Sequence, residues 1–137
     1  MRLIGARGVF SVYLPDLKVI GDQVRKTVRT GVTMNISVQQ LDDMRKSGEA
    51  HTLLDIREVE ELAAASISGA LHIPMNTIPE NLDKLPTDQP LVVMCHVGGR
   101  SAQVQMWLHG NGFENAVNLE GGIQAWSQSI DSSVPQY

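Results

Sequence analysis

Short, mostly apolar runs occur at residues 52–56, 91–95 and 116–119. Runs of this length that are apolar at successive positions are typical of strands buried on both faces in a parallel sheet. The first run carries the charged Asp55 near its end, as expected where such a strand reaches the edge of the sheet. The pattern therefore predicts three buried strands, of which 91–95 is the clearest.

Apolar positions recur at helical spacing between these runs. Ser37 and Gln40 have the spacing of a capping box, and Gly48 stands where a helix would end. Trp107 and Trp126 occupy helical positions at which large aromatic side chains fill the core. We expect helices at residues 38–47, 58–65, 78–85, 101–109 and 123–130, a turn with a short extended piece at 69–74, and an extended tail at 134–137.

Predicted strands and helices alternate along most of the chain. This order favours an α/β fold, with a small parallel sheet flanked by helices on both faces. Basic sequence punctuated by glycines gives way near Met34 to the first predicted helix, and 137 residues suffice for one core. We therefore expect a domain at residues 34–137 and an N-terminal extension at 1–33, in which residues 9–14 alternate enough to form a strand.

The net charge of −4 combines a basic part with an acidic part. Residues 1–33 carry six Lys and Arg against two Asp, whereas residues 34–137 carry five against thirteen Asp and Glu. Phosphate backbones are bound by clustered positive charge, so the acidic body argues against a nucleic-acid partner. An anionic substrate would have to be attracted by a local feature of the site.

The sequence contains one cysteine, Cys95. It cannot form an internal disulfide, and a zinc site with two or four thiolates cannot be built from it. No apolar run approaches the roughly 18 to 20 residues of a membrane span, and the N-terminus lacks the apolar core and cleavage site of a signal peptide. We expect a soluble protein of a reducing compartment, the cytoplasm, with no membrane partner.

The segment from Cys95 to Ser101 lies between the clearest strand and a helix, where open α/β sheets place their ligands. Gly98 and Gly99 let the backbone curl so that several N–H groups point at one centre, and the helix adds the positive end of its dipole. Such a setting lowers the pKa of a cysteine thiol. The pattern favours Cys95 as a catalytic nucleophile over the alternative of a small buried hydrophobic residue.

Arg100 adds a permanent charge and a planar set of donors that suit an oxyanion, such as the sulfonate end of thiosulfate. We predict that the substrate is bound by His96, Val97, Gly98, Gly99, Arg100 and Ser101. His96 could serve as a general base, whereas a side chain that points outward is the simpler alternative. Asp55 and Arg57 follow a strand end, and a charge pair there would support the loop.

Four motifs resemble, in the same order, those of the rhodanese-type sulfurtransferases. The pattern Cys-x-x-Gly-x-Arg-Ser at residues 95–101 resembles the active-site loop of that family. The other motifs are LLDIREVEEL at 53–62, ISGALHIP at 67–74 and NLEGGIQAW at 118–126. The residues from 130 to 137 further resemble the end of small rhodanese domains. The resemblance implies a rhodanese-like fold over residues 34–137.

The resemblance also implies a two-step reaction. The Cys95 thiolate takes the outer sulfur of a small anionic donor such as thiosulfate, becomes a persulfide, and passes the sulfur to a thiophilic acceptor. Cyanide is the usual acceptor in assays of the family, and a thiol or a sulfur-carrier protein is the acceptor expected in a cell. The reaction requires neither a metal nor an organic cofactor.

Two alternatives remain open at this stage. One is a sulfur-relay or interaction module that takes persulfide from a partner and shows little activity on thiosulfate. The other is a phosphatase of the same fold, whose loop also pairs a cysteine with an arginine. The phosphatase loop is one residue longer than the stretch between Cys95 and Arg100, so the spacing favours the sulfurtransferase.

Overall fold

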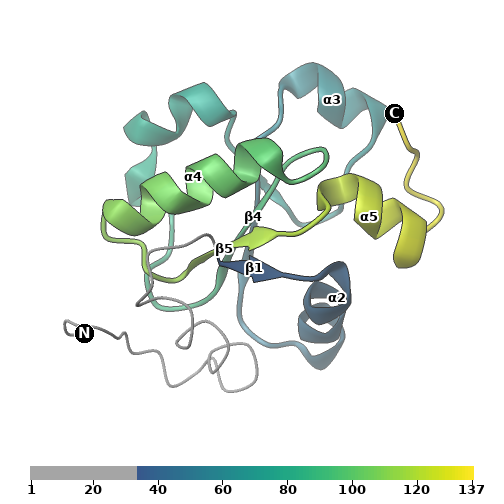
Figure 1. The fold of residues 1–137 in the computed structure, drawn as a ribbon, viewed down its shortest axis with the longest axis horizontal. Coiled ribbons are helices and arrows are strands. Elements are labelled where there is room, and N and C mark those ends of the chain that lie inside the picture. The colour runs from purple at the N-terminus through teal and green to yellow at the C-terminus, as the bar shows by residue number, and fades with distance from the viewer. Residues whose placement is uncertain (1–33) are drawn as a thin grey trace.

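A parallel sheet of five strands lies at the centre of residues 34–137, the part of the chain that this computed structural model describes (Figure 1). The strands are β1 (Asn35–Ile36), β2 (Thr52–Asp55), β3 (Leu71–His72), β4 (Leu91–Met94) and β5 (Ala116–Leu119). Their order across the sheet is β1-β5-β4-β2-β3, so that β4 lies in the middle with β2 and β5 beside it. The loops that follow these three parallel strands meet at one edge of the sheet, where the candidate site lies.

Helices cover both faces of this sheet. They are α2 (Val38–Ser47), α3 (Val59–Ala64), α4 (Gly99–Gly110) and α5 (Gly122–Ser129), together with two 3-10 helices, η1 (Met75–Glu80) and η2 (Leu82–Lys84). Alternate residues of β4 face opposite sides. Leu91 and Val93 pack in one buried cluster with α4 and η1, whereas Val92 and Met94 pack in another with α2 and α5. The predicted α/β class, with helices on both faces of a parallel sheet, is confirmed.

The first helix begins and ends as its capping residues predict. The Ser37 hydroxyl accepts a hydrogen bond from the Gln40 N–H at 3.1 Å, and the Gln40 side chain accepts one from the Ser37 N–H at 2.8 Å. Gly48 ends α2 in the left-handed conformation, with a φ of 75°. The capping residues recognised in the sequence therefore mark both ends of α2.

Two elements differ from the prediction. Residues 78–85 form no single helix, because the structure has η1 and η2 there instead. Pro79 lies inside η1, and since proline has no N–H to donate and a fixed φ, short 3-10 turns replace the regular helix. Strand β1 was not predicted, because two residues paired with Asn118 and Leu119 are too short to show a period.

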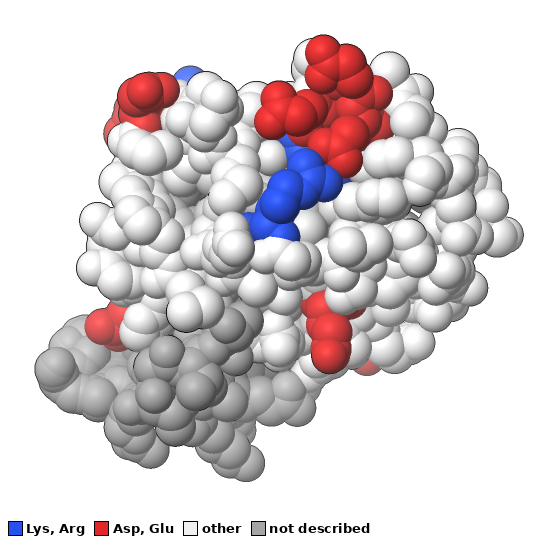
Figure 2. All heavy atoms as spheres, turned by 45° about the horizontal axis from the view of Figure 1, so that its top comes forward, with Lys and Arg blue, Asp and Glu red and all other residues white. Residues whose placement is uncertain are grey.

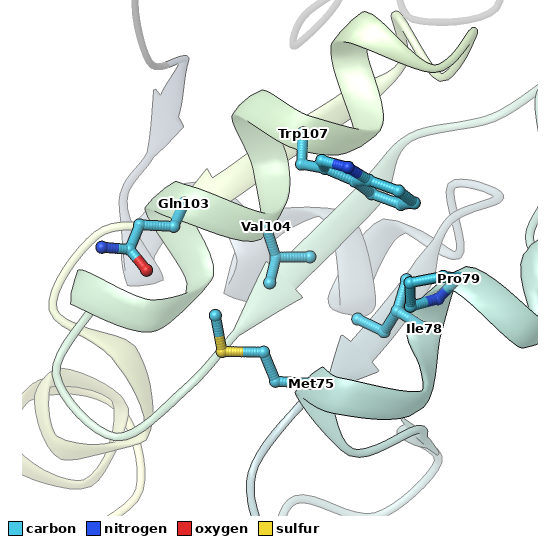
Figure 3. Close-up of a pocket in the computed structure, with 6 residues that line it drawn as sticks. All are labelled: Met75, Ile78, Pro79, Gln103, Val104 and Trp107. Atoms are coloured by element: carbon cyan, nitrogen blue, oxygen red, sulfur yellow. The ribbon is translucent and has the colours of Figure 1, made fainter.

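Trp107 was predicted to fill the core, and this prediction is wrong, because Trp107 is 41% exposed. Val104 and Leu108 point from α4 into the core, which leaves Trp107 on the flank of the helix. There its indole lines an apolar surface pocket of about 320 Å³ between α4 and η1 (Figure 3). Trp126 on α5 is buried, as predicted.

Residues 1–33, with the strand predicted at 9–14, lie outside the described residues. Within residues 34–137, no helix has the length and apolar character needed to cross a bilayer.

Gly122, the first residue of α5, lies directly against the loop that follows β4. The N–H groups of Ile123 and Gln124 donate to the carbonyl oxygens of Cys95 and His96 at 3.0 and 3.1 Å. Gly122 has a φ of 61°, and a Cβ atom placed on it would overlap these same two carbonyl oxygens. A glycine is therefore required for α5 to hold the loop in place.

Replacing Gly122 by alanine should destabilise the fold, because the left-handed backbone and the close contact both oppose a side chain. Each effect costs on the order of 1–3 kcal/mol, so the free energy of unfolding in urea should fall by about 2 kcal/mol or more. Gly110→Ala is the matched control, since an added Cβ at the end of α4 meets only open space. Equal stability of the two variants would show that the contact at Gly122 is unimportant.

Candidate active site around Cys95

Cys95 directly follows the central strand β4, and the loop after it enters α4 at Gly99. Its sulfur accepts hydrogen bonds from the Gly98 N–H at 3.1 Å, the Ser101 hydroxyl at 3.2 Å and the Ser101 N–H at 3.4 Å. Gly98 makes the turn possible with a φ of 109°. The structure thus brings together three donors around one sulfur at the start of a helix.

These donors decide the ionisation of the thiol. Burial alone would raise the pKa of Cys95, because it takes water away from the thiolate. The hydroxyl and N–H of Ser101 and the N–H groups of Gly98 and Val97 outweigh burial, so the pKa of the Cys95 thiol lies below its ordinary value. The loop therefore favours the thiolate, which is the nucleophilic form.

The sulfur is nevertheless enclosed, because Cys95 is only 1% exposed. Cys95 belongs to the buried hydrophobic cluster beneath α4, together with Leu54, Ile56 and Val104. Very little of the surface of Cys95 is therefore open to a donor in this conformation.

Asn118 on β5 takes part in the site, although the sequence analysis assigned it only a position in one motif. Its side-chain oxygen lies 2.5 Å from the Ser101 hydroxyl, and its amide nitrogen donates to Asn35 at 2.8 Å. A hydroxyl has a single hydrogen, so Ser101 can donate either to Asn118 or to the sulfur, but not to both at once. Asn118 thus competes with Cys95 for one of the three donors. The only signal in the sequence was a polar residue inside an otherwise apolar run.

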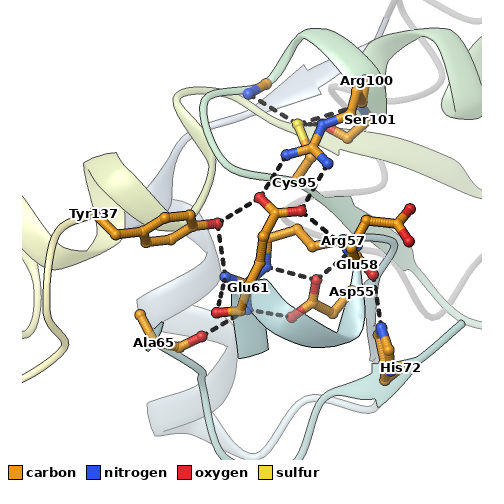
Figure 4. A network of polar contacts seen from close by, with 11 residues as sticks. Asp55, Arg57, Glu58, Glu61, Ala65, His72, Cys95, Arg100, Ser101 and Tyr137 are labelled. Carbon is orange, nitrogen blue, oxygen red and sulfur yellow. Dashed lines mark hydrogen bonds and ion pairs between the residues drawn. The ribbon is translucent and has the colours of Figure 1, made fainter. Parts of the chain in front are cut away.

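Arg100, on the first turn of α4, faces Glu61 of α3 (Figure 4). Its two terminal nitrogens donate to the two carboxylate oxygens of Glu61, each at 2.9 Å. This bidentate pair holds the pKa of Glu61 well below its ordinary value, at about 2. The oxyanion-binding role predicted for Arg100 stays a prediction, and in the structure its guanidinium binds an internal carboxylate.

Arg57 is fully buried, and all five of its side-chain N–H groups are used within the protein. Two bonds, at 2.9 and 2.7 Å, go to the carboxylate of Asp55. The other three go to the carbonyl oxygens of Glu61 and Ala65 and to the Tyr137 hydroxyl. The Asp55–Arg57 pair therefore joins β2 to α3 beside the cysteine loop, and no N–H group of Arg57 is left for a substrate.

Tyr137, which the sequence analysis assigned only to an extended tail, joins the hydrogen-bonded network formed by Arg57, Glu61 and Arg100. Its hydroxyl accepts a hydrogen bond from Arg57 at 2.9 Å and donates one to Glu61 at 2.8 Å. Its ring stacks on the imidazole of His96, with 4.0 Å between the ring centres and 10° between the planes (Figure 4 shows the tyrosine beside Glu61). The residue thus reaches across the site from the far end of the described chain.

The remaining loop residues lie at different depths. His96 is half-buried against Tyr137, whereas Val97 is 56% exposed and Gly99 is exposed on the first turn of α4. Gly98 and Ser101 contact the sulfur, and Val97 acts on it through its N–H group. Within residues 34–137, no group of three His, Cys, Asp or Glu side chains is placed to hold a metal ion.

Residues 37–129 match the family model described as Rhodanese-like domain. The chain belongs to the rhodanese-like family. The resemblance inferred from the four sequence motifs is thereby confirmed, and the loop that carries Cys95 lies inside the matched part of this rhodanese-like domain.

Relatives of this rhodanese-like domain are found among both sequences and structures. The putative sulfurtransferase YtwF of Bacillus subtilis is 41% identical over 91 residues, which cover 66% of this chain and 87% of YtwF. The thiosulfate sulfurtransferase GlpE of Ectopseudomonas mendocina is 31% identical over 101 residues, which cover 74% of this chain and 91% of GlpE. A rhodanese-like domain protein from Staphylococcus aureus has a crystal structure that matches with a TM-score of 0.67 at 33% identity, over 77% of this chain and 99% of that one. Two plant relatives are longer, and this chain spans 30% and 23% of their lengths.

Ser101→Ala should raise the pKa of the Cys95 thiol, because the variant loses a hydroxyl that lies 3.2 Å from the sulfur and can donate to it. The pH dependence of Cys95 alkylation by iodoacetamide, followed by intact mass, measures this pKa. Ser127→Ala is the matched control, since Ser127 is also buried but donates to the Val134 carbonyl oxygen instead. If the alkylation profile of Ser101→Ala overlays that of wild type, the hydroxyl does not act on the sulfur.

The Arg100–Glu61 pair should stabilise the fold in a defined pH range. The pKa of Glu61 is lowered from 4.5 to about 2, so the stabilisation is complete above pH 4.5 and is lost as the pH falls from there towards 2. Urea unfolding should show wild type more stable than Glu61→Gln at neutral pH, with a difference that shrinks below pH 4.5. A difference independent of pH would mean that the charge of Glu61 contributes nothing.

Proposed function

We propose that this rhodanese-like domain moves a sulfane sulfur from a donor such as thiosulfate to a thiophilic acceptor, through a persulfide on Cys95. The observation that carries the proposal is the convergence of the Gly98 and Ser101 donors on the cysteine sulfur. These donors favour a thiolate at the end of β4, and the thiolate is the form that attacks sulfur in the transfer. The proposal is also supported by similarity to GlpE, which is named a thiosulfate sulfurtransferase.

In the first step the Cys95 thiolate attacks the outer sulfur of thiosulfate. A new sulfur–sulfur bond forms to Cys95, the sulfur–sulfur bond of thiosulfate breaks, and its electron pair leaves with sulfite. The total charge is −3 on both sides of the step, as the sum of −1 and −2. The loop N–H groups then donate to the persulfide as they donate to the thiolate, which is preorganised electrostatic stabilisation.

In the second step the acceptor attacks the outer sulfur of the persulfide and regenerates the Cys95 thiolate. With cyanide the product is thiocyanate, and with a thiolate it is a new persulfide on the acceptor. We propose a small thiol or a sulfur-carrier protein as the acceptor in the cell. The reaction needs a reduced Cys95, so we also propose the cytoplasm as its location.

A second candidate function is a sulfur relay that accepts sulfur and passes it to a partner with little turnover of free thiosulfate. The enclosure of Cys95, which is 1% exposed, favours this candidate. A relay becomes loaded with sulfur but releases thiocyanate slowly when cyanide is added. Rapid and repeated thiocyanate release would favour the enzyme.

Incubation with thiosulfate should increase the intact mass of the protein by one sulfur atom, and Cys95→Ser should show no increase. The serine hydroxyl is far less acidic than the thiol and cannot form a persulfide, while it keeps the size of the side chain. Cyanide should then remove the added mass from wild type as thiocyanate.

Loading is also measured with cysteine persulfide, a donor that lacks the sulfonate group. If neither donor loads wild-type protein whose Cys95 reacts freely with iodoacetamide, the proposed function is wrong. Loading that persists in Cys95→Ser would place the sulfur elsewhere and would equally contradict it.

A further inference from the structure

The guanidinium of Arg100 is already neutralised in the folded chain. Both of its terminal nitrogens bind the carboxylate of Glu61 at 2.9 Å. Arg57, the other arginine of the network, is paired in the same way with Asp55. The two pairs have no net charge, so the network around Cys95 has no unpaired arginine to attract an anion.

Glu61 is fixed in this position by more than Arg100. The Glu58 N–H donates to one carboxylate oxygen at 3.0 Å, and the Tyr137 hydroxyl donates to the other at 2.8 Å. The Glu61 side chain is 20% exposed, so its ion pair is partly shielded from water. A donor anion that used Arg100 would have to compete with a carboxylate that is held by three groups.

The surface beside this pair is acidic. Glu58 and Glu60 are exposed at the start of α3, next to Glu61. Figure 2 shows the Lys and Arg atoms of this face directly bordered by a larger group of Asp and Glu atoms. An approaching dianion therefore meets negative charge before it meets a free positive one.

We infer that Glu61 is a specificity-determining residue, which competes with the donor for Arg100 and so disfavours dianionic thiosulfate relative to a persulfide carried on a thiol. This inference rests on the proposed sulfur transfer through Cys95. A thiol persulfide has no sulfonate and does not need the guanidinium. The Cys95 thiolate attacks the outer sulfur of R–S–SH, the sulfur–sulfur bond of the donor breaks, and its electron pair leaves on R–S⁻. The proton stays on the new Cys95 persulfide, and the total charge is −1 before and after.

Glu61→Gln tests the inference, because it removes the charge and keeps the shape. Glutamine at this position still suits the capping box of α3, since its oxygen can accept the Glu58 N–H. The rate of sulfur loading on Cys95 is measured at low donor concentration, by alkylation of the remaining thiol followed by intact mass. With thiosulfate the rate should rise about tenfold, because the donor dianion gains a free guanidinium. With cysteine persulfide, whose reacting form has no net charge, it should change by less than about twofold.

Two control variants separate this effect from others. Glu60→Gln removes the same charge from the same helix at an exposed position, and screening should keep its effect on thiosulfate loading below about twofold. Tyr137→Phe removes the hydrogen bonds of the hydroxyl to Glu61 and Arg57 but leaves both charges of the Arg100–Glu61 pair, so it should shift the ratio of the two donors by less than Glu61→Gln does. Glu61→Asp withdraws the carboxylate from Arg100 and should shift the ratio in the same direction as Glu61→Gln by a smaller factor, which gives a second test should glutamine impair folding.

The outcomes distinguish this inference from the proposed function. If wild type loads from both donors and Glu61→Gln changes both rates equally or neither, sulfur transfer stands and the role of Glu61 is overturned. If Glu60→Gln acts as strongly as Glu61→Gln, the general surface charge sets the donor preference and the specific pair does not. If no variant loads from either donor, the proposed function itself fails.

Discussion

The hydrogen bonds to the sulfur of Cys95 are the interaction on which the rest of the site depends. A charged sulfur at the end of a strand that is buried on both faces would be strongly disfavoured without donors to replace water. Gly98 and Ser101 supply them at 3.1 to 3.4 Å, because the chain turns at Gly98 and enters α4 at once. The central strand, the turn and the helix therefore position donors that replace the hydrogen bonds water would make to the Cys95 thiolate.

Neutral dipoles, rather than net positive charge, carry most of this stabilisation. Each arginine of the network is matched by a carboxylate, Arg57 by Asp55 and Arg100 by Glu61. Pairing of this kind fixes the position of α3 and of Tyr137 beside the loop. The negative charge of the thiolate is then stabilised by the N–H groups of the loop and not by a free arginine. Dipoles held by the backbone are less sensitive to salt than an exposed guanidinium would be.

The parts of the fold that follow from short stretches of sequence were predictable. The apolar runs predicted β2, β4 and β5, and the capping residues predicted α2. The glycine pair in the cysteine loop indicated that backbone N–H groups would point at the sulfur. Contacts between distant segments were not predictable, because tertiary packing decides them. Glu61 and Arg100 are 39 residues apart, and Tyr137 and Arg57 are 80 apart. Trp107 shows the same limit within one helix, since its spacing fits an inward position but Val104 and Leu108 are the residues of α4 that pack into the core, and Trp107 lies on the flank of the helix.

Titration of the single cysteine in the folded and the unfolded chain tests the central claim most directly. The ultraviolet absorbance of the thiolate is followed against pH in buffer and again in concentrated urea, with Cys95→Ser as the blank. The account predicts that Cys95 ionises at a lower pH in the folded chain than in the unfolded one. Ionisation at the same or a higher pH in the folded chain would contradict it.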